Sequence, residues 1–145
     1  MSTKEIQAEI VENMRKWQKI ENSSIASTGA IMEKTENPII RLVMEIIQRD
    51  SQMHYRIQEI IADSLEQKAV SLNPDELVKV WDMVEKHILL EKETVRLARN
   101  SLNALKGKKM VVQEYLLDYL MKDEEKHNQV LDSLETIKKG MYPYG

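Results

Sequence analysis

The sequence predicts an all-α protein, a four-helix bundle built from two repeated helical hairpins. The chain of 145 residues has only three Pro and four Gly, and it has nine Met but no Phe, a composition that favours long helices. Apolar residues recur at helical spacing in four long segments. The two halves of the chain also resemble each other. We therefore expect one domain, residues 1–145, that is long enough to bury a core.

The first helix is predicted over residues 3–34. Ser2 and Glu5 have the spacing of a capping box, in which each side chain accepts a hydrogen bond from the backbone of the other residue. The apolar stripe of this helix becomes polar in its middle. It consists of Ile6, Ile10, Met14, Trp17, Glu21, Ser24, Thr28 and Ile31.

The second and third helices are predicted over residues 38–66 and 74–105, and both begin at an Asn-Pro pair. Asparagine is a favoured N-cap residue, and proline is favoured at the first helical position. In the second helix the middle of the stripe is again polar. The stripe of the third helix is apolar throughout except for Glu91, so its carboxylate should point into the core. Its Trp81, like Trp17 of the first helix, is expected in that core.

The fourth helix is predicted over residues 110–139, and residues 140–145 are predicted as a tail. Gly140 is expected to stop the helix. Glu124 and His127 lie three residues apart on the apolar stripe, which places both side chains on one inward face about one turn apart.

The second half of the chain repeats the first. Residues 47–54 align with 120–127 at an offset of 73, pairing Asp with Asp and His with His. Residues 17–25 align with 87–95 at an offset of 70, pairing Glu with Glu. Two such hairpins packed about a pseudo-twofold axis would bring their polar residues to one level of a four-helix bundle.

Two interpretations of these inward polar residues remain open. Carboxylates and imidazoles on facing helices suit Fe(II), Mn(II) or Zn(II), and an unpaired carboxylate in the core would be costly. The alternative is a metal-free helical interaction or scaffold protein, in which a buried Glu/Asp–His network fixes the helix register. The candidate metal ligands are Glu21, Asp50, His54, Glu91, Glu124 and His127.

Four further residues lie close enough to these candidates to support them. His87 is one turn before Glu91, Tyr119 is within two turns of Glu124, and Asp123 is next to Glu124. We expect them, with Gln18 near Glu21, to hydrogen-bond to the ligands instead of binding metal directly.

The chain resembles the ferritin-like superfamily, the di-iron carboxylate bundles of bacterioferritin and rubrerythrin type. That family has Glu on its first and third helices and Glu-x-x-His on its second and fourth. Residues 123–127 look like the fourth-helix motif, and Glu91 precedes Glu124 by the usual separation of 33 residues. In the first half, Ser51 occupies the position of the bridging Glu, and Gln18 lies 33 residues before it. The resemblance implies a mid-bundle iron site, with one or two ions per chain and with possible oxidoreductase activity towards O2 or peroxide.

The connection between the hairpins distinguishes two topologies. A ferritin-like bundle has a long crossover between its second and third helices, whereas here only residues 67–73 connect the predicted second and third helices. If all polar sites are level, an up-down-up-down order closes more easily, because seven extended residues span at most ~25 Å. We keep the ferritin-like topology as the prediction and the up-down-up-down order as the alternative.

Charge and composition exclude several classes of function. The net charge is −3 and no basic block is present, which argues against nucleic-acid binding. The absence of Cys rules out disulfides and cysteine-ligated metals. The polar N-terminus and the absence of a long apolar run predict a cytoplasmic protein that does not enter membranes. Exposed apolar surface can support a homo-oligomer such as a dimer, and no motif identifies a small-molecule substrate.

Overall fold

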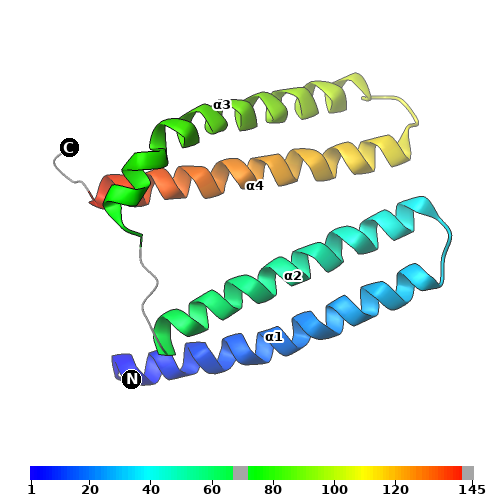
Figure 1. Ribbon diagram of the computed structural model, residues 1–145. Coiled ribbons are helices and arrows are strands. Elements are labelled where there is room, and N and C mark those ends of the chain that lie inside the picture. The colour runs from blue at the N-terminus through cyan, green and yellow to red at the C-terminus, as the bar shows by residue number, and fades with distance from the viewer. Residues whose placement is uncertain (67–71, 142–145) are drawn as a thin grey trace. The chain divides into compact units, whose positions relative to one another are not determined.

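The structure, a computed structural model, describes residues 1–66 and 72–141. These residues form helices and no strands, so the predicted all-α class is confirmed. None of the described helices has an apolar stretch that could cross a membrane. The helices are α1 (Thr3–Glu33), α2 (Pro38–Glu66), α3 (Pro74–Ala104) and α4 (Val111–Met141) (Figure 1).

The helices pair in chain order as two antiparallel hairpins (Figure 1). The contacts divide the chain into two compact units, residues 1–71 with α1 and α2, and residues 72–145 with α3 and α4. The predicted pair of helical hairpins is therefore confirmed. The choice between a crossover and an up-down-up-down order falls on residues 67–71, which lie outside the described residues.

The predicted caps begin three of the helices. Ser2 and Glu5 form the complete capping box, with both hydrogen bonds 3.1 Å long. The Asn37 side chain accepts from the backbone N–H groups of Ile39 and Ile40, and Asn73 accepts from that of Asp75 in the same way. These side chains satisfy N–H groups that have no partner within the helix, which explains why the helices begin there.

The predicted end of the fourth helix is wrong, because α4 continues through Gly140 to Met141. Glycine in a helix costs only about 1 kcal/mol relative to alanine, so a single glycine near a helix end does not have to stop it. Among the described residues, the glycine with a left-handed conformation is Gly107, with φ of 75°, in the turn between α3 and α4. The first and third helices end one residue earlier than predicted.

Each hairpin places polar residues at the helix contact as well as apolar ones. Among the residues that the structure describes, the buried apolar ones are Ala62, Leu77, Trp81, Val95 and Ala98, and the buried polar ones are Gln18, Glu21, Thr28, Ser51, Gln58 and Glu91. Trp81 thus lies in the core as predicted. Trp17 does not, because 49% of its surface is exposed. The buried polar residues lie mainly in the middles of their helices, where the sequence predicts a site.

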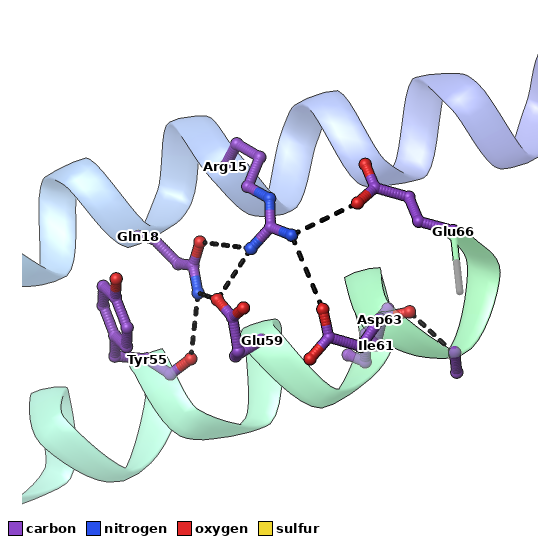
Figure 2. Close-up of polar contacts among 8 residues, drawn as sticks. Arg15, Gln18, Tyr55, Glu59, Ile61, Asp63 and Glu66 are labelled. Atoms are coloured by element: carbon purple, nitrogen blue, oxygen red, sulfur yellow. Dashed lines mark hydrogen bonds and ion pairs between the residues drawn. The ribbon is translucent and has the colours of Figure 1, made fainter. Parts of the chain in front are cut away.

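An arginine near the middle of α1 connects this helix to the C-terminal part of α2. Figure 2 shows the Arg15 guanidinium directed at three carboxylates of α2. It donates to Glu59 at 2.7 Å and to Glu66 at 3.4 Å, and it lies 3.7 Å from Asp63. Gln18 joins the cluster by donating to Glu59 at 2.6 Å. One guanidinium therefore holds the last two turns of α2 against α1.

The pKa of Glu59 is lowered, first by the hydrogen bond from Gln18 and then by the charge of Arg15. A carboxylate with a lowered pKa stabilises the folded state above its ordinary pKa, and this stabilisation is lost as the pH falls through the lowered value. We therefore expect the melting temperature to decrease as the pH is lowered below 4.5, the ordinary pKa of a glutamate. Glu59→Gln should melt at a lower temperature than the wild type at neutral pH, and the difference should shrink in acid.

Circular dichroism melts of both proteins across this pH range test the expectation. Glu12→Gln is the matched control, because Glu12 pairs with Lys16 on the surface of α1 alone, where ion pairs contribute little. A difference between wild type and Glu59→Gln that stays constant with pH would contradict a role for the Glu59 charge.

Candidate metal site

The middle of the second hairpin brings three of the predicted ligands together. Glu91 comes from α3, and Glu124 and His127 come from α4. Each offers one ligand atom, and the three atoms lie within 4.8 Å of one another. Glu91 is 9% exposed because it replaces an apolar residue on the buried stripe of α3. Glu124 and His127 are half-buried.

One nitrogen of His127 faces both carboxylates. Its Nδ1 lies 3.3 Å from Glu91 Oε2 and 3.6 Å from Glu124 Oε2. Two atoms bound to one ion at about 2.0–2.2 Å are at most ~4.4 Å apart, so these separations fit a shared ion. The other nitrogen, Nε2, lies 3.5 Å from Asp123 Oδ2. A carboxylate at this position can orient the ring and leave Nδ1 free for a metal.

His87 contacts the opposite oxygen of Glu91. Its Nε2 is 2.8 Å from Glu91 Oε1. The Glu91 carboxylate thus lies between two imidazoles, one on each oxygen, and His87 can hold its orientation while Oε2 remains available. The supporting role of His87 at a metal site stays a prediction.

The two carboxylates influence each other. The hydrogen bond to Glu124 lowers the pKa of Glu91, and the contacts of Glu91 with His87 and His127 act in the same direction. The same bond to Glu91 raises the pKa of Glu124. Two facing carboxyl groups favour the protonated form of one of them, and a divalent cation bound between them would favour the charged form of both.

Thr94 is a part of this cluster that sequence reasoning missed. Its hydroxyl oxygen lies 2.8 Å from Glu124 Oε2 and 2.7 Å from the backbone oxygen of Glu91, one turn earlier on α3. The repeat contained a signal, because the offset of 70 residues aligns Thr94 with the hydroxyl residue Ser24.

The other predicted site residues lie in different surroundings. In the first hairpin, His54 Nδ1 lies 3.5 Å from the buried Glu21 Oε2, while Asp50 is half-buried one turn before His54. Gln18 bonds to Arg15, Glu59 and the backbone oxygen of Tyr55, none of which is a predicted ligand. Tyr119 is half-buried on α4. The prediction that these residues serve a metal stays a prediction.

The described geometry defines an all-α chain of helical hairpins, one of which carries a cluster of two carboxylates and an imidazole. Comparison with known proteins adds no identification: no family model, no curated protein and no solved structure matches the chain.

Proposed function

We propose that the second hairpin binds one divalent metal ion, iron(II) or the related manganese(II) or zinc(II), through Glu91, Glu124 and His127. The observation that supports it most directly is His127 Nδ1, which lies within 3.6 Å of an oxygen of each carboxylate while Asp123 faces its other nitrogen. Two carboxylates and one imidazole suit these metals, and three protein ligands leave a coordination position for water or substrate.

The proposal agrees with the resemblance of residues 123–127 to the ferritin-like motif, and membership of that superfamily is part of the proposal. A bound redox-active ion would supply the capacity for electron transfer to O2 or peroxide. The protein's own residues would hold and orient it, with Thr94 on Glu124, His87 on Glu91 and Asp123 on His127.

Metal addition should raise the stability of the purified protein, because a ligand that binds only the native state stabilises it. At a free metal concentration 100 times the dissociation constant, the gain is about 2.7 kcal/mol. For a chain of this size that raises the melting temperature by about 5–10 °C. Calorimetric melts with and without Mn(II), Zn(II) or, under anaerobic conditions, Fe(II) measure the rise in melting temperature. Elemental analysis of protein purified without added metal gives the metal content.

Calcium serves as the control ion, because it prefers six to eight oxygen ligands that this cluster does not offer. A metal content below ~0.3 ions per chain, with no rise in melting temperature for any of the three ions, would contradict the proposal.

A second candidate function, a metal-free interaction or scaffold protein, is favoured by a different observation. The cluster is already hydrogen-bonded without metal, since both Glu91 oxygens face imidazole nitrogens and Glu124 pairs with Thr94. The described helices also expose many large apolar side chains, among them Met83, Leu90 and Leu97 at intervals of seven on α3. Such a stripe is typical of helices that pack against a partner.

A further inference from the structure

The first hairpin preserves half of the cluster found in the second. Glu21 and His54 align with Glu91 and His127 in the sequence repeat. The same two atoms face each other in both hairpins. The distance from the histidine Nδ1 to the glutamate Oε2 is 3.5 Å for His54 and Glu21 and 3.3 Å for His127 and Glu91. Both glutamates are buried, Glu21 being 6% exposed. The duplicated sequence thus folds into a duplicated carboxylate–imidazole pair.

The hairpins differ at the third member of the cluster. Glu124 in α4 lies 2.8 Å from the Thr94 hydroxyl. The residue that aligns with Glu124 is Ser51 in α2, and its hydroxyl lies 2.8 Å from that of Ser24, which aligns with Thr94. A hydroxyl pair therefore replaces the hydroxyl–carboxylate pair, with the same separation of 2.8 Å but without the negative charge.

The buried Glu21 carboxylate faces its imidazole less closely than Glu91 does. Glu21 Oε2 is buried and has no hydrogen bond within the described part of the chain, and His54 Nδ1 lies 3.5 Å away as an ion-pair partner. In the second hairpin both oxygens of Glu91 face imidazole nitrogens. A buried carboxylate oxygen without a hydrogen bond is costly, so its presence beside His54 fits a group that can face a cation.

We propose that residue 51 determines how many metal ions the chain binds. With serine there, Glu21 and His54 supply two ligands, fewer than the three that protein metal sites commonly use. Residue 51 is three positions before His54, as Glu124 is before His127, so a glutamate at 51 lies on the same face as the histidine. A carboxylate at position 51 then completes a second site. This inference rests on the proposed function of the second hairpin.

Ser51→Glu tests the inference. We expect it to bind about one more Mn(II) ion per chain than the wild type, because it restores the third protein ligand. Glu124→Ser makes the second hairpin resemble the first and should lose its ion. The double variant should bind about one ion again, now in the first hairpin. Ser51→Gln has the size of glutamate without its charge and should bind as the wild type does. Calorimetric titration and elemental analysis measure the number of ions.

The outcomes separate this inference from the proposed function. A wild type that binds no Mn(II), Fe(II) or Zn(II) overturns both. A wild type with one ion and a folded Ser51→Glu with one ion overturns only the role of residue 51. If Ser51→Glu folds only when Mn(II) is added, the inference is supported, because the new carboxylate then depends on the ion. If Ser51→Glu does not fold even with Mn(II), the test depends on Glu124→Ser, which gives the second hairpin the serine of the first. Retention of the metal ion by Glu124→Ser then overturns the inference.

Discussion

Replacing Glu91 with glutamine is expected to abolish metal binding, the largest functional effect that any single substitution should have. Glu91 faces His87 on one oxygen and His127 on the other, and it shares a hydrogen bond with Glu124. Glutamine keeps the size and one acceptor oxygen but removes the charge. Loss of a residue that only supports a ligand costs about 10- to 100-fold in metal affinity, so loss of a ligand should cost at least that much.

The measurement is metal content after dialysis against Mn(II), with the melting temperature recorded in parallel. Glu93→Gln is the matched control on the same helix, because Glu93 is exposed and pairs with Arg96 on the surface. That variant should bind metal as the wild type does. If Glu91→Gln kept the wild-type metal content and lost only stability, the metal-free network would be the better account of the cluster.

Truncating Trp81 is expected to cause the largest loss of stability. Trp81 is 6% exposed, its indole N–H donates to Glu85 at 3.0 Å, and Lys138 of α4 lies 4.8 Å above its ring. Trp81→Ala removes the largest buried side chain of the described core, and such substitutions cost about 3–5 kcal/mol. Most proteins have a free energy of unfolding of only about 5–15 kcal/mol, so this loss is a large part of the total.

Urea unfolding monitored by circular dichroism gives the free energy of unfolding for wild type and variant. The same substitution at Trp17, which is half exposed, provides the comparison and should cost less than half as much. Equal losses at the two positions would contradict the difference in burial between them.

The helices and the centre of the candidate site were predictable because both depend on local spacing. Asn37 and Asn73 bond to the first turns of their helices, so the caps can be recognised within a few residues. Glu124 and His127 share a face because they are three residues apart, and Glu91 interrupts an apolar stripe. Their meeting across two helices followed from the repeat, since both halves show the same pattern.

The contacts that were not predicted depend on how one helix is rotated against the next. Trp17 and Gln18 are adjacent, and a turn of about 100° per residue separates their faces. In α1 the buried face holds Gln18 and Glu21, so Trp17 is left partly outside. Arg15 meets Glu59 and Glu66 across 44 and 51 residues of sequence, and no local pattern signals such a pairing.

The position of Arg15 affects how the first hairpin loses its structure. Helices usually fray from their ends, where few contacts oppose local opening. Here the last two turns of α2 are tied to the middle of α1, because Arg15 pairs with Glu59, Asp63 and Glu66, the last residue of α2. Fraying of this end of α2 must break these ion pairs, whereas residues 3–14 of α1 lie beyond Arg15. Amide exchange should therefore be slower in the last two turns of α2 than in the first turns of α1.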